Sequence, residues 1–213
     1  MGICRFTLRS WAVSTTTRHR AGYCEAMSPV GVLLAAGAGR RMGGPKALVR
    51  GADGVPWVLR SVDVLRVGGC TEIAVVVGAA ADQVMDLLAA ADVAIVPSVS
   101  WQDGVSASLK SGLAWAATTA ADAAIVHLVD LPDVGSDVVR RIITAGRSND
   151  PAQVLLRAGF HGSGGHPVLL GRAHWSGALA AAQGDRGANA YLTAAGCTLV
   201  PCEDLAEGND RDS

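Results

Sequence analysis

The stretch LLAAGAGRRMGGPKAL, residues 33–48, joins an apolar run to a loop with four glycines and three basic side chains. The apolar run predicts a buried strand, and the glycines let backbone N–H groups approach an anion closely. Arg40, Arg41 and Lys46 can neutralise phosphate charge. Because ligands of open parallel sheets lie beyond the carboxyl ends of the strands, we expect this loop to bind phosphate.

Lysine usage draws attention to the same loop. Lysines and arginines number 18 together, but only Lys46 and Lys110 are lysines. An ammonium is a compact charge where a guanidinium is a planar fork, so the two are not interchangeable at a phosphate. Lysine at position 46, against the bias of the chain, suggests a site that requires an ammonium.

Two common phosphate motifs do not fit the stretch. A Walker loop places Ser or Thr after its lysine to reach magnesium, whereas Ala47 follows Lys46 here. A dinucleotide fingerprint has a third glycine where this chain has Met42, and Pro45 keeps the following residues irregular. The second predicted strand also ends at Gly78, without the acidic residue that would bind a ribose. Neither motif therefore explains the loop.

Composition restricts the class of protein. The chain has 213 residues, half of them hydrophobic and 17% charged, with a net charge of -1, which predicts one globular domain. We expect neither a nucleic-acid-binding nor a membrane-spanning protein. The five cysteines form no CxxC pair, which argues against zinc and a disulfide framework and favours the cytoplasm. Cys197 and Cys202 can pair, but small buried thiols are the favoured interpretation.

The two ends of the chain differ from its middle. Residues 1–27 are rich in Arg, Ser and Thr and poor in acids, which suits either a transit peptide or a disordered extension before a true start at Met27. We favour the disordered extension. Residues 28–203 form one predicted domain, and residues 204–213 a frayed acidic tail.

Apolar runs and helical periods alternate along the domain. This alternation predicts a Rossmann-like three-layer α/β/α fold with a mostly parallel sheet. The predicted strands are Val30–Ala36, Glu72–Gly78, Val93–Pro97, Ala123–Val129, Gln153–Phe160 and Cys197–Cys202. The predicted helices are Trp57–Val67, Ala81–Ala90, Ser106–Ala117, Asp137–Ala145, Trp175–Gln183 and Ala188–Ala195. His161–His166, with the sequence HGSGGH, is predicted as a flexible loop.

Residues Leu34–Lys46 match every fixed position of the nucleotidyltransferase signature LAAGxGxRMGxxK. In this stretch the chain resembles the MobA-like NTP transferases, and most closely their molybdenum cofactor cytidylyltransferase branch. Four further segments resemble family motifs in the same order: Trp101–Gly112, His127–Pro132, Gly165–Pro167 and Gly184–Ala188. One departure is Val99-Ser100, where relatives often carry Asn-Pro. The resemblance implies the nucleotide-diphospho-sugar transferase type of fold.

The resemblance also assigns roles to residues. It implies catalysis by Arg41, Lys46 and Asp130. Nucleotide binding falls to Leu34, Ala35, Ala36, Gly37, Gly39, Arg40, Arg41, Lys46 and Ser108. Magnesium binding falls to Asp130 and Asp185, and acceptor binding to Gly165, His166 and Pro167.

Several of these roles have structural alternatives. Asp130 can instead cap the following helix, as can Asp133, although metal binding is favoured for Asp130. Asp185 can be a second metal ligand or head a helix, and the two are equally weighted. His166 can simply be exposed, and Ser108 can bond to its own helix. Trp101, Trp115 and His127 are predicted to belong to the core, the last as a satisfied interior histidine.

The implied reaction is magnesium-dependent transfer of NMP from an NTP to the phosphate of a molybdopterin-type cofactor, with release of pyrophosphate. Ala36 resembles the cytidylyl branch, which implies CTP, whereas a second glycine there would resemble the GTP-using branch. A molybdoenzyme or its chaperone is the implied partner. Two hypotheses remain open: transfer to a sugar, polyol or phospholactate phosphate, and non-catalytic binding of a nucleotide or cofactor.

Overall fold

A seven-stranded sheet in the order β3-β2-β1-β4-β6-β5-β7 carries the fold. The computed structural model describes residues 27–210. All five residues of β1 are buried, as expected for a central strand covered on both faces. The strands are β1 (Val30–Leu34), β2 (Ile73–Val77), β3 (Ala94–Pro97), β4 (Ala123–Leu128), β5 (Leu155–Phe160), β6 (Ser163–Gly171) and β7 (Thr198–Pro201).

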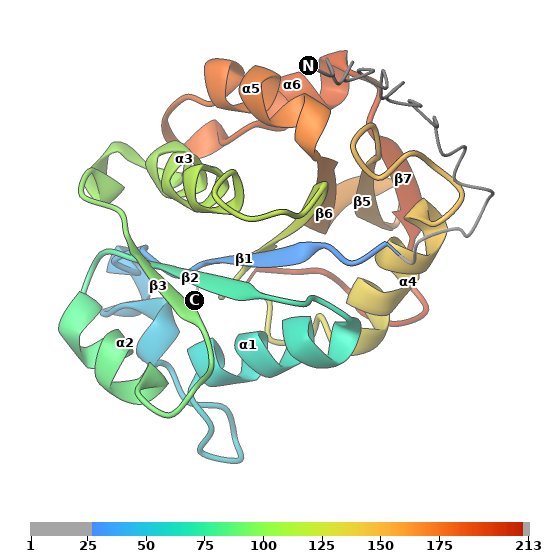
Figure 1. Ribbon diagram of the computed structural model, residues 1–213. Helices are drawn as coiled ribbons and strands as arrows, with labels where there is room; N and C mark the ends of the chain where they lie inside the picture. Colours follow the sequence, from blue (N-terminus) through green and yellow to red (C-terminus); the bar gives the residue numbers. More distant parts are fainter. Residues whose placement is uncertain (1–26, 211–213) are drawn as a thin grey trace, which may run out of the picture.

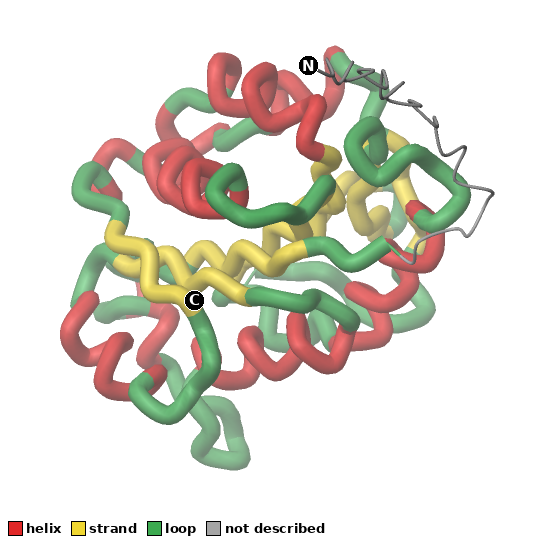
Figure 2. The backbone as a smooth tube through the Cα atoms, in the orientation of Figure 1, coloured by secondary structure: helices red, strands yellow, loops and turns green. Residues whose placement is uncertain are grey.

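Helices cover both faces of the sheet. In Figure 1, α1, α2 and α4 lie on one side and α3, α5 and α6 on the other, and Figure 2 shows the strands between these two helical layers. The helices are α1 (Trp57–Gly68), α2 (Ala81–Leu88), α3 (Val105–Ala116), α4 (Ser136–Gly146), α5 (Arg172–Ala181) and α6 (Asn189–Ala194). The predicted three-layer fold with a mostly parallel sheet is confirmed.

Parallel pairing brings two strand ends together. β1 pairs in parallel with β2 on one side and β4 on the other, and Leu34 lies opposite Leu128. Beyond this pair, the Val129 amide donates to the Leu34 carbonyl at 3.2 Å. The glycine-rich loop that follows β1 and Asp130, which follows β4, therefore leave the same edge of the sheet side by side.

The prediction of a flexible loop at His161–His166 is wrong, because most of these residues belong to strand β6. His161 and Gly162, with φ of 50° and 80°, form the two-residue turn of a β5–β6 hairpin. β6 pairs antiparallel with both β4 and β5. Hairpin pairing with β5 thus holds Ser163 and Gly164 extended, where local composition indicated a loop, and β4 pairs with residues 168–171 further along β6.

The acidic tail is held against the domain over residues 204–210, where fraying was expected. Asp204 forms an ion pair with Arg141 of α4. A carboxylate oxygen of Asp133 accepts from the Glu207 and Gly208 amides at 3.1 and 3.0 Å. At the other end, Met27 is 7% exposed and packs into the core, and the rest of the expected N-terminal extension lies outside the described residues.

Within residues 27–210, no helix is both long and apolar enough to cross a membrane. Cys70, Cys197 and Cys202 are free thiols. Cys197 and Cys202, which flank β7, do not pair.

Candidate functional site

A pocket of about 700 Å³ opens at the carboxyl ends of β1 and β4. Its floor is the sheet face formed by Leu34, Val126 and Val168, and its roof comes from α3 and from the segment 185–192. The glycine-rich loop closes one end, and Arg157 and His166 line the part formed by β5 and β6. The pocket thus lies where the sheet topology predicts a ligand.

The glycine-rich loop is folded on itself by backbone hydrogen bonds. The Gly39 carbonyl accepts from the Met42 amide at 2.9 Å and from the Gly44 amide at 3.2 Å. Gly39 has a φ of 56°, and a Cβ there would collide with the Gly44 carbonyl oxygen. Two short 3₁₀ turns, Arg40–Met42 and Lys46–Leu48, carry the basic side chains. Glycine at position 39 is therefore required for this shape.

We expect Gly39→Ala to weaken NTP binding more than it destabilises the domain. The added methyl group must open the turn at Gly44 and so displaces the basic side chains, whereas the buried strand β1 is untouched. The left-handed backbone itself costs about 1–2 kcal/mol. Calorimetric titration with CTP and thermal unfolding measure the two effects. Gly43→Ala is the matched control, because a Cβ at position 43 meets no atom although φ is 77°.

Lys46 and Asp130 meet in the pocket although 84 residues separate them. Lys46 Nζ donates to a carboxylate oxygen of Asp130 at 2.8 Å, and the two side chains are 14% and 19% exposed. The other oxygen of Asp130 is buried and has no hydrogen-bond partner among residues 27–210. A buried carboxylate oxygen without a donor is suited to a hard cation.

The helix-cap alternatives for the acidic residues fail. α4 begins after Gly135 with no side-chain hydrogen bond at its cap, so neither Asp130 nor Asp133 caps it. Asp133 instead holds the C-terminal tail. α6 likewise has no side-chain cap, so Asp185 does not cap it.

Asp185 lies in a 3₁₀ turn, residues 184–186, and lines the pocket. A Cβ on Gly104, at the start of α3, would lie 2.5 Å from its carboxylate oxygen. Asp130 and Asp185 thus line one pocket. Within residues 27–210, however, no group of three His, Cys, Asp or Glu side chains could hold a metal ion.

His166 reaches the pocket from an irregularity in β6. Arg157 pairs with Val168 and Gly159 with Gly164, so one residue of β5 faces three of β6. The bulge turns the half-buried His166 ring into the pocket. Burial lowers the pKa of His166 to about 3, with smaller lowering effects from His127 and Arg157, so its ring is neutral near pH 7.

Most of the predicted site residues line the pocket. They are Leu34, Ala36, Gly37, Gly39, Arg40, Arg41, Lys46, Ser108, Asp130, His166 and Asp185. The structure does not place Ala35, Gly165 or Pro167 in the lining. Ala35 is buried in the core on the opposite face of the sheet, because alternate residues of a strand face opposite ways.

Other residues of the lining were not predicted from the sequence: Gln102, Arg157, Arg186, Asn189 and Asp210. Trp101, predicted as core, also lines the pocket, whereas Trp115 packs only against the core. A Cβ on Gly78 would lie 2.6 Å from the Trp101 ring, so the glycine that follows β2 leaves room for this indole. The position of Gly78 directly after a buried strand was the one feature of the sequence that pointed to a close contact there.

His127 is fully buried in β4, as predicted, but it is not satisfied. Neither ring nitrogen has a hydrogen-bond partner among the described residues. Burial lowers the pKa of His127 to about 4, against a smaller raising effect of Asp133. A neutral imidazole thus occupies an apolar position.

We expect His127→Leu to flatten the pH dependence of stability between pH 6.5 and 4. The unfolded histidine binds its proton near pH 6.5 and the folded one only near pH 4. Stability is therefore full above pH 6.5 and falls as the pH drops towards 4, by about 3 kcal/mol for this residue. Urea unfolding across this range compares the two proteins. An unchanged slope in the variant would show that His127 does not carry the effect.

Comparison with known proteins agrees with the fold. The family model described as the MobA-like NTP transferase domain matches residues 31–199. The nicotine blue oxidoreductase of Paenarthrobacter nicotinovorans is 33% identical over 196 residues, which cover 86% of this chain and 91% of that protein.

Solved structures show the same architecture. Rv0371c from Mycobacterium tuberculosis H37Rv has a TM-score of 0.67 at 27% identity, over 83% of this chain and 87% of that one. A nucleotidyl transferase from Methanothermobacter thermautotroptrophicus has a TM-score of 0.68 at 24% identity, over 82% and 87%. At the latter identity the likeness concerns the fold alone.

Proposed function

Because the chain belongs to the MobA-like NTP transferase family, we propose that it transfers a nucleoside monophosphate from CTP to the phosphate of a molybdopterin-type cofactor. An acceptor phosphate oxygen attacks the α-phosphorus, and the bond to the β-phosphate breaks to release pyrophosphate. The acceptor is already an anion, so the step needs no general base. The protein's work is to align the two substrates and to neutralise the charge that moves to the leaving group.

The meeting of Lys46 and Asp130 in a pocket closed by a glycine-rich loop carries this proposal. The loop offers backbone amides, and Arg40, Arg41 and Lys46 supply positive charge at the same end of the pocket. An incoming triphosphate competes with Asp130 for the Lys46 ammonium. This arrangement favours binding of a clustered polyanion at that end.

Asp130 is the residue that we expect to hold a divalent cation. Its buried oxygen lacks a donor among the described residues, which fits a metal–oxygen bond. Asp185, which lines the same pocket, is a second candidate ligand. When bound, Mg²⁺ would neutralise phosphate oxygens and take few protein ligands, keeping several waters.

The choice of CTP rests on Ala36, the position that resembles the cytidylyl branch. A Cβ on Gly78 would lie 2.8 Å from the Ala36 methyl group and 2.6 Å from the Trp101 ring. Ala36, Trp101 and Ser108 all line the pocket. Their position beside the glycine-rich loop supports binding of the nucleoside by the part of the pocket that these three residues line.

A panel of CTP, GTP, UTP and ATP with molybdopterin cofactor, scored by pyrophosphate release, tests the proposal. CTP with Mg²⁺ should be the best substrate. Release with CTP and a sugar, polyol or phospholactate phosphate, but not with molybdopterin, would reassign the acceptor. Binding that is indifferent to Mg²⁺, without pyrophosphate from any pair, would indicate a non-catalytic binding protein.

The curated relative favours a second candidate function, since its name describes an oxidoreductase that acts on nicotine blue. In this chain the corresponding reaction would be reduction of an organic dye by a nicotinamide nucleotide, whose diphosphate Arg40, Arg41 and Lys46 would neutralise although the loop lacks the dinucleotide fingerprint. Loss of absorbance at 340 nm with NADH or NADPH and a quinonoid dye tests it. Steady oxidation of either reductant, without pyrophosphate release from any NTP, would favour this candidate.

We also propose a cytoplasmic location and a molybdoenzyme, or its chaperone, as the recipient of the product. The free thiols of Cys70, Cys197 and Cys202 are compatible with a reducing compartment. Co-purification of this protein with a molybdoenzyme, tested with and without CTP, would support the partner, and its absence under both conditions would count against it.

A further inference from the structure

Arg157 lies in the pocket at β5, away from the glycine-rich loop, and the function proposed above gives it no role. Its Nε donates to the Gly165 carbonyl at 3.2 Å and one terminal nitrogen to the Gly164 carbonyl at 2.6 Å. The other terminal nitrogen donates to the Asn189 side-chain oxygen at 2.8 Å. A guanidinium carries five N–H donors, so these three bonds fix its plane and leave two for a ligand.

Gly164 provides the space in which the guanidinium lies. A Cβ at position 164 would approach Nε of Arg157 to 2.5 Å and Cζ to 2.6 Å. The β6 bulge at residues 165–167 begins directly after this glycine and turns His166 into the pocket beside Arg157. The glycine-rich sequence Ser163–His166 therefore positions a cation.

Among residues 27–210, no carboxylate forms an ion pair with Arg157. Other arginines form ion pairs with carboxylates at the surface: Arg60 with Asp53, Arg66 with Asp63, Arg140 with Asp137, and Arg141 with Asp204. Among residues 27–210, Arg157 has no such pair, although Asp185 and Asp210 line the same pocket. Burial lowers its pKa, against a smaller effect of Cys197. A half-buried cation of this kind favours an anionic ligand.

The sheet separates Arg157 from the nucleotide end of the pocket. β1, which leads into the glycine-rich loop, and β5 are three strand spacings apart in the order β1-β4-β6-β5. This puts the two strand axes roughly 14 Å apart. The Arg157 side chain reaches inward over β6, where it donates to the Gly164 and Gly165 carbonyls, so a phosphate bound there lies between the two strands and towards the nucleotide. The two clusters of positive charge therefore suit two different anions, one on each substrate.

We propose that Arg157, with Asn189 and His166, forms a second anion subsite that binds a phosphate monoester group of the acceptor. The identification of the ligand as the acceptor rests on the proposed transferase function, whereas the anion subsite itself does not. Arg157 supplies the charge and two donors, and Asn189 holds its guanidinium. The neutral His166 ring offers one further hydrogen bond.

Inorganic phosphate is the probe for this subsite. We titrate it into the protein saturated with Mg²⁺ and a non-hydrolysable CTP analogue, which occupies the glycine-rich loop. The NMR signal of the His166 ring and calorimetry report binding. Arg157→Met should weaken phosphate binding tenfold or more. Equal affinity of wild type and Arg157→Met, or no change in the His166 signal on phosphate addition, would overturn the proposal.

Arg172→Met is the matched control. Arg172 also donates to backbone carbonyls, at Thr119 and Ala121, and stacks on Trp175, but it does not line the pocket. It should leave phosphate affinity unchanged. If Arg157→Met fails to fold, Gly164→Ala keeps the charge but displaces the guanidinium, and should also weaken phosphate binding.

Lys46→Ala separates this inference from the proposed function. It should lose the CTP analogue but still shift the His166 signal with phosphate at wild-type affinity. If wild-type protein binds no CTP analogue, the transferase proposal fails, and phosphate titration of the free protein still tests Arg157. Loss of the His166 response in Lys46→Ala would place the anion at the glycine-rich loop and overturn the second subsite.

Discussion

Lys46→Ala is expected to lower pyrophosphate release from CTP by roughly 10²–10³-fold, the cost of removing one preorganised donor from a charge-stabilising site. The lysine Nζ lies 2.8 Å from Asp130 and is positioned at the phosphate end of the pocket. Stability should fall much less, by about 1–2 kcal/mol, because one half-buried carboxylate loses its partner. Steady-state kinetics and thermal unfolding measure the two losses.

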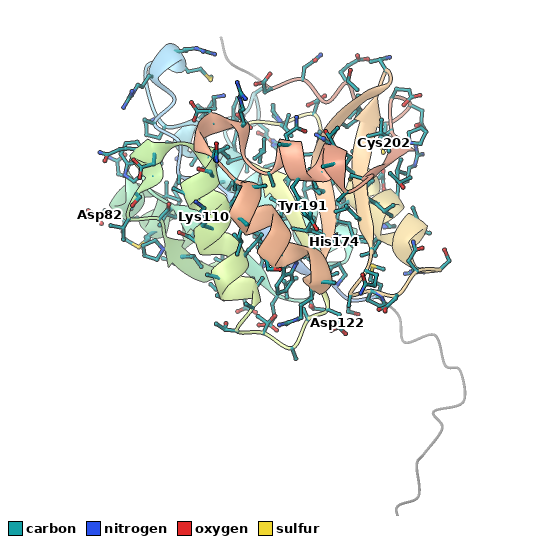
Figure 3. All side chains as sticks on the ribbon, turned by 90° about the horizontal axis from the view of Figure 1, so that it is seen from above. Asp82, Lys110, Asp122, His174, Tyr191 and Cys202 are labelled. Carbon is teal, nitrogen blue, oxygen red and sulfur yellow. The ribbon has the colours of Figure 1, made fainter. Side chains whose placement is uncertain are left out.

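Lys110→Ala is the control for this variant. Lys110, the second of the two lysines, is exposed on α3 (Figure 3) and does not line the pocket. It should retain wild-type turnover. The double variant Lys46→Ala with Asp130→Ala removes both charges, and should recover stability without recovering activity. Losses of stability and turnover that are equal in size in Lys46→Ala would contradict a phosphate-binding role.

Asp130→Asn should abolish the dependence on Mg²⁺ and lower turnover a hundredfold or more, since a metal ligand contributes several kcal/mol of charge stabilisation. The substitution keeps the shape of the side chain but removes the charge from its unpartnered oxygen. Turnover at a series of Mg²⁺ concentrations measures the effect. The rise of turnover with Mg²⁺ concentration should disappear in the variant.

Asp122→Asn is the matched control for Asp130→Asn. Asp122 directly precedes β4, whereas Asp130 follows it, so the two residues lie at opposite ends of this strand. Figure 3 shows Asp122 in a loop at the edge of the molecule. The carbonyl of Asp122 accepts from the Arg172 amide at 2.7 Å, and an amide side chain leaves that bond intact. An Mg²⁺ response of Asp130→Asn identical to that of Asp122→Asn would remove Asp130 from the metal site.

The central part of the fold follows from local sequence. Buried strands such as β1 are continuous apolar runs, and α1 begins at the predicted Trp57 and ends one residue past the predicted Val67. β6 could not be found in this way, because its extended form depends on pairing with β4 and β5. The ion pair of Asp204 in the tail with Arg141 could not be predicted either, since Arg141 lies 63 residues earlier in the chain.

Spacing and resemblance also predicted one half of the site better than the other. The glycine-rich loop and Asp130 each follow a recognisable strand, so their meeting could be expected from parallel pairing. The role of Arg157 could not be predicted in this way, because arginine is common in strands. Only the bulge in β6 and the space left by Gly164 place its guanidinium in the pocket. The hydrogen bond between His174 Nδ1 of α5 and the Tyr191 hydroxyl of α6, at 2.8 Å, could not be predicted from the sequence either. Figure 3 labels both residues.

Transfer of label from α-³²P-CTP tests the central claim most directly. The protein is mixed with labelled CTP, molybdopterin cofactor and Mg²⁺ under single-turnover conditions, and the cofactor is separated from the nucleotide. The label should appear in the cofactor with one pyrophosphate released for each label transferred. Absence of label in the cofactor and of pyrophosphate, for CTP and for each of the other three NTPs, would contradict the account.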